Sequence, residues 1–225
     1  PTRRSSDLVF KVIPLLLLAA LVFLRQRVAR VFAIYVALLS VLLPLGQSIA
    51  HTPHYGLVIM WGNLVLYLVV ALFWAWEAVA GRNDFSAVRP PMSRYWVAPL
   101  AALAFWFPAN TAGPVPRPDF SPLLLLANEA GLTYCLMAPV FLAVLVLAYP
   151  RVNRPVMRVT AFAGLLTGLM NLLQWFVLQP AAWWMGVLHL PLVLISADAL
   201  VLAGRGESHR GNLRTTPSAG LEAGH

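Results

Sequence analysis

The chain has 225 residues, of which 60% are hydrophobic and 11% are charged, with a formal net charge of +8. Soluble domains contain roughly 45–50% apolar and about 25% charged residues, so this composition excludes an ordinary soluble fold. The basic residues flank apolar segments instead of lining one face, which argues against nucleic acid as a partner. We expect them to meet the head groups of anionic lipids.

The first eight residues resemble the conceptual translation of a common sequencing adapter. We expect residues 1–8 to be an artefact of that kind and leave them out of the fold prediction, as one would an expression tag. Under this expectation the natural start is missing, and a further helix before Val9 stays an open alternative.

Seven segments are apolar enough to be transmembrane helices, which need about 20 residues each. They cover residues 9–24, 31–50, 57–80, 95–107, 123–149, 159–178 and 183–203. The fourth is short, and a run of about 13 residues is also typical of a re-entrant segment. The tail, residues 204–225, is polar and rich in Gly, Ser, Thr and Arg, so we expect it to be disordered. The sequence thus predicts an all-α integral membrane protein, a bundle of seven transmembrane helices over residues 9–203.

Four clusters of arginine alternate with loops that carry little positive charge. They are Arg25, Arg27 and Arg30; Arg82, Arg89 and Arg94; Arg151, Arg154 and Arg158; and Arg205, Arg210 and Arg214. The positive-inside rule places such clusters in the cytoplasm. The visible N-terminus is then outside, the C-terminus is cytoplasmic, and the helix number is odd: seven, or five if one hairpin is misread. We interpret the chain as a multi-pass protein of the cell membrane, and we expect this membrane to be the plasma membrane of a prokaryote.

Six polar side chains fall near one depth when each helix is measured inward from its outer end, about 10 Å below the surface. They are Asn63, Asn128, Glu129, Asn171, Gln174 and His189. Ionisable and amide groups are costly inside a span, so we interpret them as an outward-facing pocket for a small solute or ligand, centred on Glu129 and His189. The alternative is that they hydrogen-bond one another and fasten the helices together.

A metal site is a weaker interpretation of the outer histidines. His51 and His54 have a spacing that metal sites use, and His189 is a conceivable third ligand. Pro53 makes their loop irregular, and only His189 lies well inside a helix, so we expect neither metal nor haem. A retinal Schiff base needs a lysine in the bundle, and the only lysine, Lys11, lies near the outer end of the first segment.

No motif in the chain identifies a family or a substrate. Cys135 is the only cysteine, which excludes an intramolecular disulfide. Gly164 and Gly168 form a GxxxG pattern, which permits close contact between two helices. We interpret the protein as non-catalytic, serving in transport, binding or as an accessory subunit, with the lipid bilayer and a protein partner or a second copy as partners. Two alternatives stay open: an intramembrane metal-dependent enzyme that uses the outer histidines and Glu129, and a seven-helix sensor.

Overall fold

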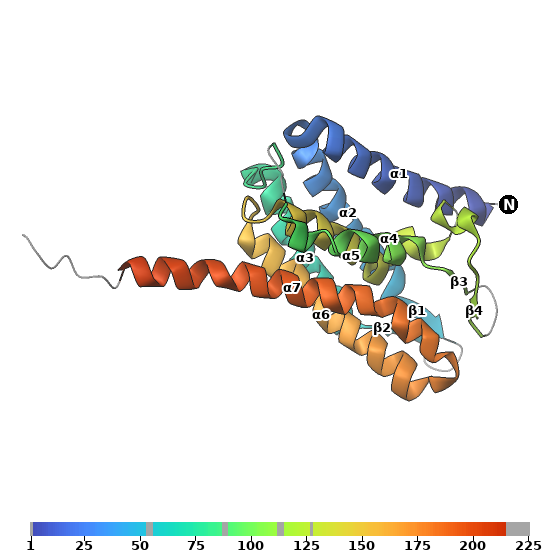
Figure 1. Ribbon diagram of the computed structural model, residues 1–225. Coiled ribbons are helices and arrows are strands. Elements are labelled where there is room, and N and C mark those ends of the chain that lie inside the picture. The colour runs from blue at the N-terminus through green and yellow to red at the C-terminus, as the bar shows by residue number, and fades with distance from the viewer. Residues whose placement is uncertain (1, 53–55, 87–89, 112–114, 127, 215–225) are drawn as a thin grey trace, which may run out of the picture.

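The computed structural model describes residues 2–52, 56–86, 90–111, 115–126 and 128–214, which are mostly helical (Figure 1). The α-helices are α1 (Thr2–Leu24), α2 (Ala29–Gln47), α3 (Trp61–Ala80), α4 (Val97–Trp106), α5 (Tyr134–Ala148), α6 (Arg154–Leu173) and α7 (Trp183–Arg214). The short helical segments are η1 (Arg25–Val28), η2 (Met92–Arg94), η3 (Pro122–Leu125), η4 (Glu129–Leu132), η5 (Gln174–Leu178) and η6 (Pro180–Ala182).

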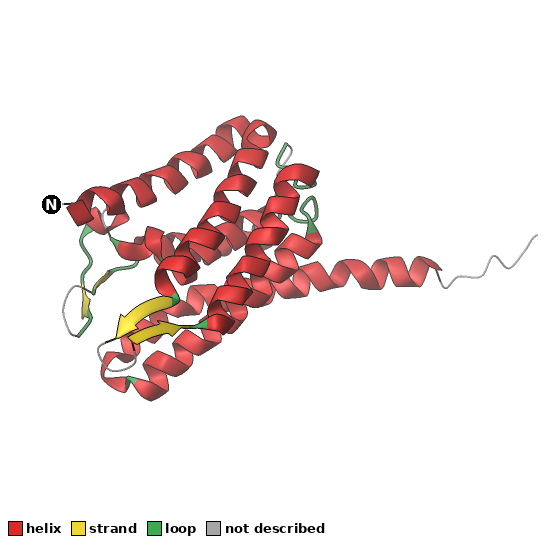
Figure 2. Ribbon diagram, turned by 180° about the vertical axis from the view of Figure 1, so that it is seen from behind, coloured by secondary structure: helices red, strands yellow, loops and turns green. Residues whose placement is uncertain are grey.

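Two small antiparallel hairpins lie at one end of the bundle (Figure 2). The first pairs β1 (Ile49–Thr52) with β2 (Gly56–Ile59), and the second pairs β3 (Ala109–Asn110) with β4 (Arg117–Pro118). In both views they lie at the end that also holds the described start of α1, opposite η1. We call this the hairpin end.

Among the described residues, four helical stretches are long and apolar enough to cross a membrane. They are Lys11–Gln47, which joins the second part of α1 to α2 through η1, then Trp61–Ala80, Arg154–Leu178 and Pro180–Arg205. The chain is therefore a helical protein suited to a membrane. α4 has 10 residues and α5 has 15, fewer than the roughly 20 that a straight span needs, so helix length does not confirm seven spans.

The fifth predicted helix is wrong over its first half, because α5 begins at Tyr134 and two short turns, η3 and η4, precede it. Asn128 and Gly131 interrupt the apolar run there, and the Asn128 side chain bonds to the backbone after α4. The predicted disorder of residues 204–225 also differs from the structure, since α7 continues to Arg214. The sequence contains no proline between Pro191 and Pro217, so every residue in this stretch has the backbone N–H that helical hydrogen bonds need. Residues 215–225 lie outside the described part.

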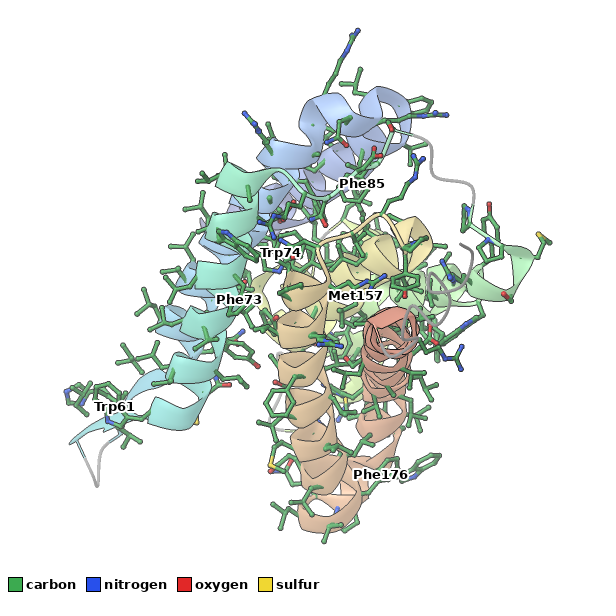
Figure 3. The ribbon with its side chains drawn as sticks, turned by 90° about the vertical axis from the view of Figure 1, so that its left-hand side faces the viewer. Trp61, Phe73, Trp74, Phe85, Met157 and Phe176 are labelled. Carbon is green, nitrogen blue, oxygen red and sulfur yellow. The ribbon has the colours of Figure 1, made fainter. Side chains whose placement is uncertain are left out.

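The core of the bundle is built around Phe32 of α2. Its ring makes edge-on contacts with Trp74, Phe85 and Phe141, at centroid distances of 5.7, 6.3 and 6.0 Å. Edge-to-face packing is the favoured geometry for such rings. Trp74 also donates through Nε1 to the Thr160 hydroxyl at 2.9 Å, which joins α3 to α6. In Figure 3, Trp74 lies between these two helices, while Trp61 lies at the far end of α3.

The predicted close helix contact at GxxxG is confirmed, and the partner is α7. A Cβ atom on Gly164 would lie 2.5 Å from the Ser196 hydroxyl, and one on Gly168 would lie 2.7 Å from Val193 Cγ2. These distances are too short for any side chain, so the two glycines set how closely α6 and α7 approach.

Glu77 is the acidic centre of a buried polar network at the end opposite the hairpins. Its carboxylate, 2% exposed, accepts the backbone N–H of Asn83 and the Asn153 side-chain amide, both at 2.6 Å. The Asn83 side-chain oxygen in turn accepts the backbone N–H of Asn153 at 2.7 Å. Gln26 completes the network by donating to the Asn83 carbonyl at 3.0 Å and accepting the Phe85 N–H at 2.8 Å. This Glu77 network ties η1, the end of α3 and the start of α6 together.

Arginines from three of the predicted clusters bond to loops at this same end. Arg25 donates to the Ser86 carbonyl at 2.8 Å, and Arg94 donates to the Tyr149 carbonyl. Arg151 forms an ion pair with Asp84 at 3.2 Å. We call this the arginine end of the bundle.

Gly168→Ala is expected to lower the free energy of unfolding by about 1–3 kcal/mol, the usual cost of overpacking. Val193 is β-branched and cannot easily rotate away from the new methyl group. The matched control is Gly62→Ala, where a Cβ would meet no described atom within 4 Å and where alanine is the better helix former. Unfolding by SDS in mixed micelles measures both variants, and equal stabilities would contradict the packing argument.

Stability is expected to fall in acid as Asp84 takes up a proton. Hydrogen bonds from the Ser86 hydroxyl and N–H, and then the charge of Arg151, lower the pKa of Asp84. Its stabilising contribution is thus complete above the unfolded pKa of about 3.9 and is lost as the pH falls through the folded value. Asp84→Asn should melt earlier than the wild type near neutral pH, by a small amount because the pair is exposed. Melting curves at several pH values should show this gap closing below about pH 4; a gap that widens in acid would contradict the sign.

Candidate functional site

Lys11 is buried in the bundle, with no exposed surface, beside the C-terminal end of α4. Its ammonium donates to the carbonyl of Phe105 and, at 3.2 Å, to the carbonyl of Leu124. The same group lies 4.2 Å from the centroid of the Phe105 ring. The last carbonyls of a helix lack partners within the helix and carry partial negative charge, so a cation there is stabilised. Lys11 therefore caps α4 from a distant part of the chain.

Asn128 and His189 both contact Phe107, which lies just after Phe105, the residue that Lys11 contacts. The Asn128 amide donates to the carbonyls of Trp106 at 2.6 Å and of Phe107 at 3.0 Å. The His189 ring packs edge-on against the Phe107 ring, with centroids 6.3 Å apart. His189 Nδ1 lies 2.8 Å from the carbonyl oxygen of Met185. Since a carbonyl can only accept, Nδ1 carries the proton, and in a neutral ring Nε2 is an acceptor.

We call Lys11, Asn128 and His189 the outer site. All three are buried, at 0%, 8% and 4% exposure. Lys11 and Asn128 bond to the backbone of residues 105–107, and His189 packs against the Phe107 ring. Phe107 belongs to a small apolar cluster with Leu136 and Ala182. The outer site thus combines an amine, an amide and an imidazole near the end of α4.

Two other predicted pocket residues lie in a polar seam between helices. Asn63 of α3 donates to the Ser48 hydroxyl at 3.0 Å, just after α2. Asn171 donates at 2.9 Å to the carbonyl of Thr167 in its own helix, α6. The Thr167 hydroxyl lies 2.8 Å from that of Tyr67, which joins α6 to α3. Here the amides and hydroxyls bond to neighbouring protein groups.

The remaining predicted pocket residues begin short helical segments. Gln174 begins η5, and its carbonyl accepts the N–H of Gln179 at 2.8 Å. Glu129 begins η4, but its side chain lies outside the described residues. The structure thus brings Asn128 and His189 to one place and puts Asn63 and Asn171 in another.

The candidate metal ligands differ in their surroundings. His51 is exposed on β1, where it is paired with Leu57 of β2, whereas His189 is buried in α7. His54 lies outside the described residues. Within the part of the chain that the structure describes, no group of three or more His, Cys, Asp or Glu side chains is placed to hold a metal ion.

Sequence reasoning missed the burial of Lys11 and the role of Glu77. We expected Lys11 near the outer end of the first helix and excluded a retinal Schiff base because we placed no lysine inside the bundle. The structure instead buries Lys11 in the bundle, so its position no longer supports that exclusion. The sequence did single out Lys11, because it is the only lysine and all the other Lys or Arg positions hold arginine.

Comparison with known proteins identifies no relative of this chain. The chain matches no protein-family model, no curated protein and no solved structure at a significant level.

Proposed function

We propose that the chain is a multi-pass integral membrane protein that binds a small acidic solute at the outer site and is not a catalyst. The observation that carries this proposal is the burial of Lys11, whose described hydrogen-bond partners are two backbone carbonyls. A buried charge is costly and, inside a membrane protein, marks a functional site by default. Such a protein serves as a transporter, a binding protein or an accessory subunit.

The solute class follows from the charge and donors of the outer site. The carbonyls of Phe105 and Leu124 offset only part of the desolvation of Lys11, and a carboxylate or phosphate would add an opposite charge. Both N–H groups of the Asn128 side chain already bond to carbonyls, whereas Nε2 of a neutral His189 can accept a hydrogen bond from a hydroxyl of the same molecule, such as that of a hydrogen phosphate. Glu129 stays in the proposed site because it follows Asn128 in the chain. Asn63 and Asn171 are left out of it, because Asn63 bonds to Ser48 after α2 and Asn171 bonds to the backbone of its own helix.

The proposed topology has seven spans, with the arginine end cytoplasmic and the hairpin end outside. It is supported by Arg25, Arg94 and Arg151, which bond to loops at one end. These positions meet anionic lipid head groups in this orientation. The α4 and α5 crossings are completed by non-helical backbone, which a membrane tolerates where protein covers it. Phe107 and Pro108, which follow α4, are buried in this way.

Cysteine labelling tests the topology. In a Cys135→Ser background, we expect Asn110→Cys to react with a membrane-impermeant maleimide in intact cells. Ser93→Cys and Arg205→Cys should react only after the membrane is opened. All three positions are exposed, and the first lies across α4 from Ser93. Equal labelling of the first two from outside would show that α4 does not cross, and the reverse pattern would overturn the orientation.

Tryptophan fluorescence tests the outer site, because Trp175 and Trp184 pack against its apolar surroundings. Acetate, succinate and phosphate are titrated at constant ionic strength into the full chain in nanodiscs. We expect a saturable change with at least one of them. Lys11→Met should weaken that binding by about tenfold or more, the loss expected for a charge-assisted hydrogen bond.

Arg117→Met is the matched control, since it removes an exposed positive charge at the hairpin end and should bind as the wild type does. His189→Phe, which keeps the ring volume, should also weaken binding and covers the case in which Lys11→Met does not fold. The proposal is wrong if none of the three anions gives a saturable change, or if both outer-site variants bind normally.

A further inference from the structure

A groove opens between α1 and α5 at the arginine end, away from the outer site. Its volume is about 380 Å³, within the range of small-molecule sites. Its walls are apolar, and its lining includes Leu21 and Val22 of α1, Val144 and Leu147 of α5, and two residues with polar groups, Arg25 and Tyr95. Among the described residues of this lining, none is acidic.

Arg25 stands at the groove in an unusual backbone conformation. Its φ angle is +48°, the left-handed region that glycine normally occupies just after a helix ends. An arginine there carries a backbone cost that glycine would avoid. Its guanidinium is held by a 2.8 Å bond to the Ser86 carbonyl, which uses one of its several N–H donors. The chain therefore keeps a positive charge at a position where the backbone favours glycine.

We propose that this groove binds an anionic phospholipid, with one acyl chain against α1 and α5 and the phosphate on Arg25. The apolar walls suit a hydrocarbon chain, which a free phosphate would leave uncovered. The planar guanidinium suits a phosphate, which it can bind through two parallel hydrogen bonds. The inference rests on the proposed membrane insertion but not on the solute at the outer site.

The position of Arg25 allows a test that separates an effect on lipid binding from an effect on the stability of the fold. The full chain in detergent is titrated with phosphatidylglycerol or phosphatidylcholine, and bound lipid is counted by native mass spectrometry. The wild type should bind phosphatidylglycerol about tenfold more tightly, as one charge-assisted contact provides. Arg25→Gly should abolish that preference while melting no earlier than the wild type, because glycine relieves the backbone. Arg25→Lys keeps the charge and should keep the preference.

A second pair of variants tests the acyl-chain part of the groove. Val22 lines the groove and is 69% exposed, so Val22→Trp should fill it without disturbing the core and should weaken binding of both lipids. Phe23, the next residue, is 82% exposed and is not part of the lining, so Phe23→Trp is the control and should bind normally. Equal affinity of the wild type for the two lipids, an unchanged preference in Arg25→Gly, or normal binding by Val22→Trp would each overturn the proposal. The anion titrations at the outer site are independent of all three outcomes.

Discussion

The buried carboxylate of Glu77 is the constraint on which the arginine end of the bundle depends. A charge removed from water must find hydrogen-bond donors, and the donors here are the Asn83 N–H and the Asn153 amide. To supply them, the loop after α3 and the start of α6 must approach each other closely. Gln26 then fixes the α1–α2 turn to the same loop. The positions of three helix ends thus follow from satisfying one charge.

The hairpin end is organised by a group of opposite sign. Lys11 and Asn128 satisfy the free carbonyls at the end of α4, so a helix of 10 residues can stop inside the bundle without leaving its last polar groups unpaired. Each end of the bundle therefore has one buried titratable side chain whose described partners are mainly amide groups. These hydrogen bonds join segments that are far apart in the chain.

The sequence predicted where apolar helices occur, and each of the seven predicted segments overlaps an α-helix. Hydropathy reports which stretches avoid water, but it carries no information about which distant carbonyl a side chain will reach. Asn128 shows this, because its bonds to the residues after α4 replace the helix expected across it. The depth argument placed Asn128 near the level of His189, and both contact Phe107, but it could not identify Lys11, whose partners lie 94 and 113 residues away.

The length of α7 gives the outer site a mechanical connection to the opposite end of the bundle. α7 is one helix of 32 residues that carries His189 near its start and projects past the other helices at its end (Figure 1). Pro191, two positions after His189, lacks the N–H that would brace the helix there. A bend of about 10° at this point would move the far end by roughly 6 Å, given a rise of about 1.5 Å per residue. A small change beside the imidazole would thereby be enlarged into a displacement at the far end of the helix.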